Sequence, residues 1–294
     1  MKIALCLSGL AKGKNDIGRD SGGIEFSINH FQENLFNKYD VDVFAHSWSI
    51  DCENEIHNLF NPKKAIIENQ IIFDSTDIVV GNGEEEQIRG KAISNGVNPD
   101  KALSNYKPPK NSCQQCKSML YSRKKSIELK REYEVENNFE YDFVLLSRFD
   151  VCFFSSFDFE NLDKTLFYHS HNTDFLVDNM KAKYNQALIY KKEPHRLTKI
   201  RRNDFNTYGY VDFWFLSNSK AMDEFGKIFD YFDEYNSNPR ERTHMGFLPC
   251  EKFTSKHLQS MRTSDDKLFT KTEPIKDRII DYELVRRWHL DSAY

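Results

Sequence analysis

The chain has 294 residues and a formal net charge of −4 at pH 7, with 29% charged and 14% aromatic residues. This length can bury a substantial core, and we expect a single domain spanning residues 1–294. The nearly balanced charge gives no reason to expect a nucleic acid partner. No apolar stretch approaches the roughly 20 residues of a membrane span, and residues 1–16 lack a secretory cleavage site. We therefore expect a cytoplasmic protein with no transmembrane segment.

Residues 2–48 have the pattern of a strand, a helix and a second strand. Residues 2–10, KIALCLSGL, form an apolar run that ends in Ser-Gly and opens into a polar, glycine-rich segment. Apolar positions in residues 24–38 recur with a helical period, and residues 40–48, DVDVFAHSW, are typical of a second strand. Such a βαβ unit favours a parallel sheet whose ligand sites lie at the carboxyl ends of the strands.

The middle of the chain combines short strand patterns, an irregular segment and a helix. Residues 64–73 and 77–80 are typical of strands. Residues 81–112 contain turn-forming residues throughout, which predicts a flexible loop or lid. Residues 113–138 contain strong helix formers with no Gly or Pro, so we expect a long charged helix that leads into the next strand.

One apolar run, YDFVLLSRFDVCFF at residues 141–154, contains two opposite charges. Arg148 and Asp150 lie two residues apart, so they project to the same side of a strand. An unpaired buried charge is costly, so the two are either paired with each other or exposed at a strand end where a ligand binds. In the second case they would suit a diphosphate, alone or with a divalent metal. The spacing does not decide between these alternatives.

The remaining patterns predict further strands and helices. Residues 165–171 are typical of a strand. Residues 208–235 begin with an aromatic strand and continue, behind a cap at Ser217–Ser219, as the most strongly amphipathic helix of the chain. Residues 245–260 favour a helix, and residues 279–287 favour a strand.

Several of these segments together resemble a known family. In chain order they are MKIALCLSGLAKG, DVDVFAHSW, SMLYSRKKSIELKREYE, YDFVLLSRFDV, YGYVDFWFLSNSKAMDEF and PCEKFTSKHL. Their order and spacing resemble nucleotide-sugar-dependent glycosyltransferases with the GT-A fold, found in capsule, lipopolysaccharide and other surface-glycan pathways. The resemblance covers roughly residues 1–60 and 113–260. It implies an α/β fold with a Rossmann-like, mostly parallel central sheet flanked by helices.

The resemblance implies a nucleotide pocket at the ends of the first two strands. It places six residues there: Ser8, Gly9, Leu10, Lys12, His46 and Ser47. Gly9 would let the backbone approach the base or ribose, Lys12 could reach a phosphate, and the His46–Ser47 pair would lie near the nucleoside.

The resemblance also implies a metal site for Mn²⁺ or Mg²⁺. The sequence SRFD, residues 147–150, occupies the place of the family's D-x-D motif, whose two aspartates bind an ion that bridges the diphosphate. Arg148 stands where the first aspartate is expected, so either Asp150 still holds an ion or Arg148 supplies part of its charge. His257 is a candidate metal ligand near the C-terminus; the alternative is an ordinary surface or core histidine on a helix.

Two carboxylates are candidates for a general base that deprotonates the acceptor. Asp212 interrupts the aromatic strand YVDFWFL, and the resemblance places it near the acceptor or donor sugar. Its alternative role is structural, as a cap or as a partner of Arg201 or Arg202. Glu251 lies near a helix start, where the helix dipole stabilises a carboxylate without any catalytic role. The sequence does not choose between them.

The sequence therefore predicts a glycosyltransferase that uses a nucleotide-sugar donor and a glycan or glycolipid acceptor. Catalytic roles fall to Arg148, Asp212 and Glu251, and metal-binding roles to Asp150 and His257. Two alternatives remain open. One is a phospho- or nucleotidyltransferase acting on a polysaccharide precursor, and the other is a catalytically silent protein that binds a nucleotide or glycan.

Overall fold

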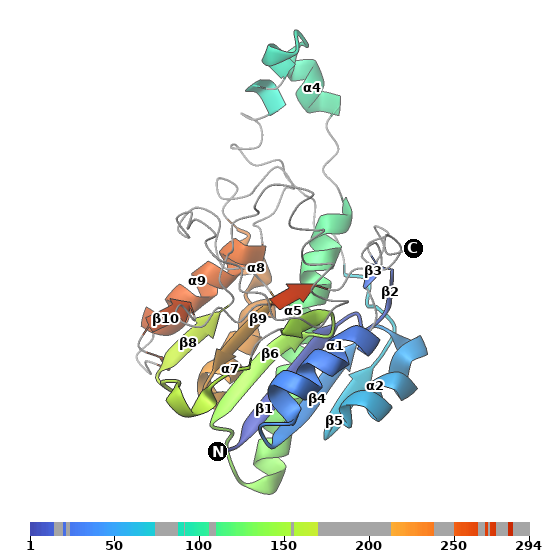
Figure 1. Cartoon of the computed structure of the whole chain (residues 1–294). Coiled ribbons are helices and arrows are strands. Elements are labelled where there is room, and N and C mark those ends of the chain that lie inside the picture. The colour runs from blue at the N-terminus through green and yellow to red at the C-terminus, as the bar shows by residue number, and fades with distance from the viewer. Residues whose placement is uncertain are drawn as a thin grey trace.

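The structure is a computed structural model of the 294-residue chain (Figure 1). It describes residues 1–14, 20–21, 24–73, 88–90, 92–105, 110–153, 156–169, 213–237, 250–263, 268–269, 271–274 and 282–284.

The described residues form an α/β fold around a seven-stranded sheet with the order β10-β8-β9-β6-β1-β4-β5. The strands are β1 (Ile3–Gly9), β4 (Val41–Ser47), β5 (Lys64–Ile67), β6 (Phe143–Arg148), β8 (Leu166–His169), β9 (Trp214–Ser217) and β10 (Lys271–Pro274). Strand β1 is parallel to β4 and β6, β4 is parallel to β5, and β8 is parallel to β10. Strand β9 is antiparallel to both of its neighbours, β6 and β8. The predicted α/β class is confirmed, and the sheet is mixed.

Two short antiparallel pairs accompany the main sheet. Strand β2 (Gly13–Lys14) pairs with β3 (Asp20–Ser21) soon after β1. Strand β7 (Val151–Phe153), which follows β6 directly, pairs with β11 (Tyr282–Leu284) from the far end of the sequence. The strand predicted over residues 279–287 therefore exists, but it joins β7 instead of the main sheet.

Strand β1 supplies both faces of the sheet because its side chains alternate. Ile3, Leu5 and Leu7 belong to one apolar cluster, and Ala4 and Cys6 belong to another. Helix α1 (Ile24–Phe31), its π-helical continuation (Gln32–Phe36) and α2 (Glu53–Phe60) cover the first face. Helices α5 (Lys110–Asn137), α7 (Ser219–Gly226) and α9 (Cys250–Thr263) contribute to the second cluster (Figure 1). Because helices cover both faces of such a sheet, a ligand reaches it at the carboxyl ends of the strands.

Helix α5 carries a fully buried lysine near its C-terminal end. The Lys130 ammonium donates to Glu134 Oε2 at 2.8 Å, to Asp223 Oδ1 at 2.6 Å and to Ser219 Oγ at 2.5 Å. Glu134 Oε1 also accepts the backbone N–H of Tyr141 at 2.7 Å. These groups, called the lysine cluster below, join α5 to α7 and to the segment that leads into β6.

The helix predicted after the Ser217–Ser219 cap is present but shorter than its pattern indicates. Asn218 provides the cap, since its side-chain oxygen accepts the N–H of Ala221 at 2.9 Å. Helix α7 then ends at Gly226, and a 3₁₀ turn (Lys227–Phe229) and the short helix α8 (Phe232–Tyr235) follow. A β-carbon at Gly226 would lie 3.2 Å from the Ile127 side chain, so glycine here permits close contact with α5.

In the described part of residues 81–112, where a flexible loop or lid is predicted, the structure has helical segments. Residues 88–90 and 92–94 are helical, α4 spans Pro99–Asn105, and α5 begins at Lys110. Asn98 caps α4 by accepting the N–H groups of Asp100 and Lys101 at 2.9 and 3.0 Å. The strand predicted at residues 77–80 lies outside the described residues.

Two further 3₁₀ turns, Ile50–Cys52 and Phe159–Asn161, complete the described elements. Among the described helices, none combines the length and the apolar character needed to cross a membrane.

Candidate functional site

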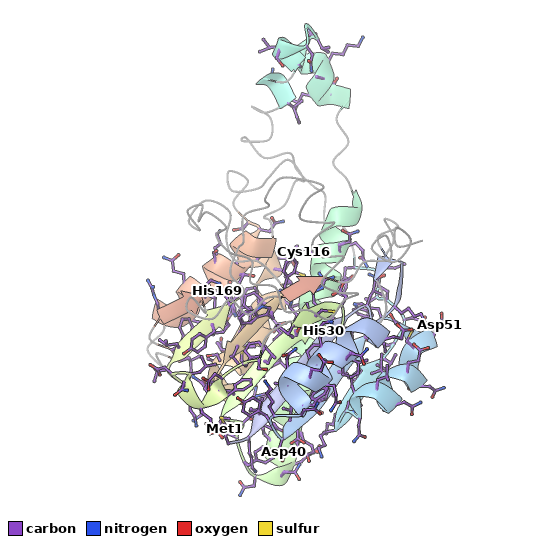
Figure 2. The ribbon with its side chains drawn as sticks, viewed as in Figure 1. Met1, His30, Asp40, Asp51, Cys116 and His169 are labelled. Atoms are coloured by element: carbon purple, nitrogen blue, oxygen red, sulfur yellow. The ribbon has the colours of Figure 1, made fainter. Side chains whose placement is uncertain are left out.

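The order of the strands identifies the candidate site. It lies where the parallel strands β1, β4 and β6 have their carboxyl ends, and this end of the sheet is called the edge below. From β1 the chain moves outward to β4 and β5, and it then returns to add β6 on the other side of β1. In such sheets ligands bind outside the carboxyl ends of the strands at the point of reversal, which here lies between β1 and β6. The parallel register pairs Ser8 with Arg148 and Gly9 with Ser47 at this edge. In Figure 2, Met1 and Asp40 mark the opposite edge, where β1 and β4 begin.

The last residues of β1 present open backbone at this edge. Gly9 has a φ of +99°, which L side chains rarely adopt, and in the described chain nothing lies within 4 Å of a β-carbon built there. Leu10 is partly exposed, whereas Ser8 is buried. A ligand could therefore approach the backbone at Gly9, but it would not contact Ser8 Oγ without a rearrangement.

The segment that follows β1 is held by Ser49. Its Oγ accepts the N–H groups of Ala11 and Lys12 at 3.1 and 3.2 Å and donates to the carbonyl of Lys12 at 2.8 Å. The N–H of Ser49 donates to Ser47 Oγ at 3.1 Å. Ser47 thus supports Ser49, and its fully buried side chain has an indirect role at most.

Lys12, the predicted phosphate ligand, is paired with two carboxylates. Its Nζ lies 3.1 Å from Glu25 Oε1 and 3.7 Å from Glu55 Oε1. The hydrogen bond and the charge of Glu25 raise the pKa of Lys12, so the ammonium stays charged. Because the three side chains are about half exposed, these pairs are weak, and a phosphate could compete for the ammonium.

His46, predicted to lie near the nucleoside, is fully buried inside a hydrogen-bond network. Its Nδ1 lies 2.8 Å from Ser122 Oγ on α5, and its Nε2 lies 3.0 Å from Glu68 Oε1 beyond β5. Trp48 packs edge-on against the ring at 4.6 Å between centroids. Burial lowers the pKa of His46 and outweighs the opposing effect of Glu68. His46 therefore lies below the protein surface and is not exposed to a ligand.

Arg148 and Asp150 form a bidentate ion pair at the end of β6. Arg148 Nε donates to Asp150 Oδ1 and Arg148 Nη2 donates to Oδ2, both at 2.7 Å. The Asp150 side chain is buried, with 1% of its surface exposed, while the Arg148 side chain keeps 24% of its surface exposed. Of the two alternatives drawn from the sequence, internal pairing is therefore present. It also fixes the guanidinium of a partly exposed side chain at the reversal point.

The Mn²⁺ or Mg²⁺ ion implied by the D-x-D resemblance does not fit Asp150 in this arrangement. Both oxygens accept hydrogen bonds from the positive guanidinium, and the carboxylate is 1% exposed, so its charge is already compensated inside the protein. A divalent ion at Asp150 would be repelled by Arg148 and would have to compete with it. Among the described side chains, no group of three His, Cys, Asp or Glu residues could hold a metal.

His257, the second predicted metal ligand, occupies a buried position on α9. Its Nδ1 lies 3.0 Å from the Tyr235 hydroxyl, and its Nε2 lies 2.9 Å from the carbonyl oxygen of Glu224. Burial lowers its pKa. Both ring nitrogens are engaged, so the geometry matches the alternative of a core histidine.

The two candidate general bases are not placed in the site. Asp212 lies outside the described residues. Glu251 is in the first turn of α9, and its side chain is not described. The residues that sequence reasoning missed are Glu68, Ser122 and Ser49. Their contacts join positions far apart in the chain, and no local pattern signals them.

A polar hollow of about 420 Å³ lies at the opposite edge of the sheet. Two of its charged residues are already paired across it, with Lys164 Nζ 2.5 Å from Asp142 Oδ1. Lys220 Nζ lies 3.5 Å from Glu140 Oε1 in the same hollow. Because strand topology and an open glycine both favour the β1–β6 edge, we consider that edge the candidate site.

No family model matches the sequence, and no curated protein matches it either.

Proposed function

We propose that the protein is a glycosyltransferase with a GT-A-like fold, which transfers a sugar from a nucleoside-diphosphate sugar to a hydroxyl of a glycan or glycolipid. The observation that carries the proposal is the orientation of Arg148 by Asp150 at the reversal point beside the open backbone of Gly9. The order of the sequence motifs supports it. So does the doubly wound arrangement of β5, β4, β1 and β6, which is typical of nucleotide-binding sheets.

In this reaction the bond between the anomeric carbon and the diphosphate oxygen breaks, and a bond to the acceptor oxygen forms. Negative charge develops on the leaving diphosphate, and a fixed guanidinium stabilises it because no reorientation is needed during the reaction. Arg148 is held by two charge-assisted hydrogen bonds and meets this requirement. The acceptor proton goes to a carboxylate, with Asp212 and Glu251 as candidates, or to the leaving diphosphate.

Nucleotide binding provides the first test. Thermal shifts with UDP, GDP, ADP and CMP, each with EDTA and with Mn²⁺, should show stabilisation by at least one nucleotide. Because Arg148 already donates to both carboxylate oxygens of Asp150, we expect nucleotide binding to need no metal and the thermal shift to persist in EDTA. A matched control is Arg89→Gln, which breaks an Arg–Asp pair outside the sheet (2.6 Å to Asp100) and should leave the shift unchanged. No shift with any nucleotide would contradict the proposal.

The mass of the product tests the reaction itself. With the nucleotide-sugar that matches the bound nucleotide and a set of glycan acceptors, transfer should add the mass of one sugar residue. An increment that contains phosphate would instead support a phospho- or nucleotidyltransferase.

The pairing of Asp150 also favours a second candidate, a silent nucleotide-binding protein. An enzyme that had lost its metal site would still bind the nucleotide through Arg148 and the end of β1. It would show a thermal shift but neither hydrolysis nor transfer of the donor.

A further inference from the structure

A chain of hydrogen bonds links the backbone of Gly9 to a carboxylate on the other side of β4. The Gly9 N–H donates to Ser122 Oγ at 2.7 Å, Ser122 Oγ lies 2.8 Å from His46 Nδ1, and His46 Nε2 lies 3.0 Å from Glu68 Oε1. Four parts of the fold are joined in this way: the end of β1, the middle of α5, the end of β4 and the segment after β5. We call these groups the histidine relay.

The partners at the two ends of the relay determine the direction of every hydrogen bond. A carboxylate oxygen only accepts, so the proton of neutral His46 resides on Nε2. Nδ1 then accepts the hydroxyl proton of Ser122, and the Ser122 oxygen accepts the N–H of Gly9. The Ser122 hydroxyl has His46 Nδ1 as its nearer acceptor, at 2.8 Å, and the His46 carbonyl oxygen at 3.3 Å as a second one. Hydrogen bonds aligned in this way strengthen one another.

The relay resembles a Ser-His-Glu hydrolytic triad in composition, but its burial excludes that function in this conformation. The side chains of Ser122 and His46 have no exposed surface. The Ser122 oxygen already accepts the N–H of Gly9, so a substrate carbonyl would have no approach to it. Only the outer end is accessible, where 36% of the Glu68 side chain is exposed.

The segment around Glu68 is itself attached to α5. The side chain of Gln114 accepts the N–H of Phe73 at 2.8 Å and donates to the carbonyl of Ile71 at 2.6 Å. Gln70 donates to Ser118 Oγ at 3.0 Å. The carboxylate end of the relay is thus anchored to the same helix that supplies Ser122.

The relay ends where the backbone has an unusual conformation. Gly9 adopts a φ of +99° and faces open space, and Ser122 engages its N–H from within the protein. Ser49 fixes Ala11 and Lys12 two and three residues later. The loop after β1 is therefore held from two sides before any ligand arrives, which lowers the cost of ordering it on binding.

We propose that Glu68, His46 and Ser122 are positioning residues that hold Gly9 in the conformation that receives a nucleoside diphosphate. This inference rests on the proposed function, because the ligand is the nucleotide part of the donor. The three residues act through Gly9 and do not contact the ligand themselves.

The alignment described above contains neutral His46, and this gives the relay a measurable pH dependence. A second proton on Nδ1 would point at Ser122 Oγ, and the hydroxyl would have to turn to the His46 carbonyl oxygen, 3.3 Å away. The titratable groups around the ring are Glu68, which favours protonation, and Lys125, which opposes it, together with Tyr121 packed edge-on against it. Acid should therefore weaken nucleotide binding in the wild type.

The experiment compares two serines of α5 that are both fully buried. Ser126 donates only to the carbonyl of Arg123 within the helix, at 3.0 Å, so Ser126→Ala is the matched control for Ser122→Ala. Glu68→Ala and Glu68→Gln form the second pair, because the amide oxygen of Gln can still accept the His46 proton. The probes are UDP, GDP, ADP and CMP. Affinity is measured by calorimetry from pH 5.5 to 8, and Gly9 amide exchange is followed by NMR without a nucleotide.

Ser122→Ala removes a buried hydrogen bond to Gly9, and Glu68→Ala removes the hydrogen bond between a carboxylate and His46. We expect each variant to bind the nucleotide about tenfold more weakly. Glu68→Gln and Ser126→Ala should bind as the wild type does. Gly9 amide exchange should accelerate in Ser122→Ala alone of the two serine variants, and the acid weakening of binding should be smaller in this variant.

Two results would overturn the proposal in distinguishable ways. Equal affinities of Ser122→Ala and Ser126→Ala, with the wild type binding a nucleotide, would refute the positioning role and leave the proposed function intact. Failure of the wild type to bind any of the four nucleotides would refute both, even if Gly9 exchange showed that the hydrogen bond exists.

Discussion

Helix α5 takes part in two buried polar networks, and they differ in what they are connected to. The lysine cluster near its C-terminal end pairs Lys130 with Glu134, Asp223 and Ser219, and its contacts join helices to one another. The histidine relay, eight residues closer to the N-terminus at Ser122, has one end on the open backbone of Gly9 and the other on half-exposed Glu68. The first arrangement serves stability. The second extends to the edge where strand topology places a ligand.

The largest expected effect comes from breaking the lysine cluster. Lys130→Met leaves Glu134 buried without its cation, so we expect a loss of about 3–5 kcal/mol in the free energy of unfolding. Denaturant unfolding measures it. The control Lys227→Met removes a half-exposed pair with Glu224 and should change stability by less than about 0.5 kcal/mol. If nucleotide affinity fell with Lys130→Met at temperatures where it is folded, the two networks would not be independent.

An intermediate effect is expected at the Arg148–Asp150 pair. Arg148→Ala removes two hydrogen bonds and the compensating charge from a carboxylate that is 1% exposed, but the arginine side chain is partly solvated, so we expect a loss of about 2–3 kcal/mol. The double variant Arg148→Ala/Asp150→Asn should recover most of this stability and still fail to bind a nucleotide. Nucleotide binding by the double variant would show that the ion pair is structural only.

Lowering the pH should decrease the free energy of unfolding through two buried histidines, His46 in the relay and His257 on α9. Burial lowers the pKa of His46 and of His257 in the folded state. The unfolded chain therefore takes up protons first, and stability present above a pH of about 6.5 falls as the pH drops below it, by at most about 1.4 kcal/mol per pH unit for each histidine. Urea unfolding between pH 5 and 7.5 should show a smaller slope for His46→Asn and for His257→Asn. An unchanged slope in both would contradict this assignment.

The smallest effect is expected for Asp223→Asn within the lysine cluster. Burial raises the pKa of Asp223, so folding disfavours its charged form relative to the unfolded chain. Asn keeps an oxygen that can accept from Lys130, and we expect a change of about 1 kcal/mol or less. Thermal unfolding at pH 7 checks it. A loss as large as that of Lys130→Met would mean that the charge of Asp223, and not its hydrogen bond, holds the cluster together.

The parts of the fold that sequence predicts are those determined by local periodicity. The patterns at residues 2–10, 40–48 and 113–138 match β1, β4 and α5 to within three residues at either end, because a buried strand and a long helix each repeat with their own period. The break of the helix at Gly226 could not be predicted in this way. Gly226 lies against Ile127, which comes from another part of the chain, and no local pattern reports this contact.

In the candidate site, too, the sequence signals some residues and not others. The two charges of residues 148–150 are visible in the sequence as an exception within an apolar run. The structure shows that they pair with each other, and contact of Arg148 with a ligand stays a prediction. Ser122 carried no such signal, because a serine inside a charged helix is ordinary in sequence. Its role arises from Gly9 and His46, which are brought to it only when β1 and β4 pair beneath α5.

The pairing of β11 with β7 has a consequence for how the protein matures. Leu284 lies opposite Val151, the residue next to Asp150, so backbone near the end of the sequence braces the peptide that presents the arginine. During synthesis the sheet strands β1, β4 and β6 emerge long before this brace, and a ribosome-bound intermediate would hold them without it. Competence for binding should therefore appear only after residues 282–284 have left the ribosome, and a substitution that disturbs the pairing of β11 with β7 would affect the site from outside it.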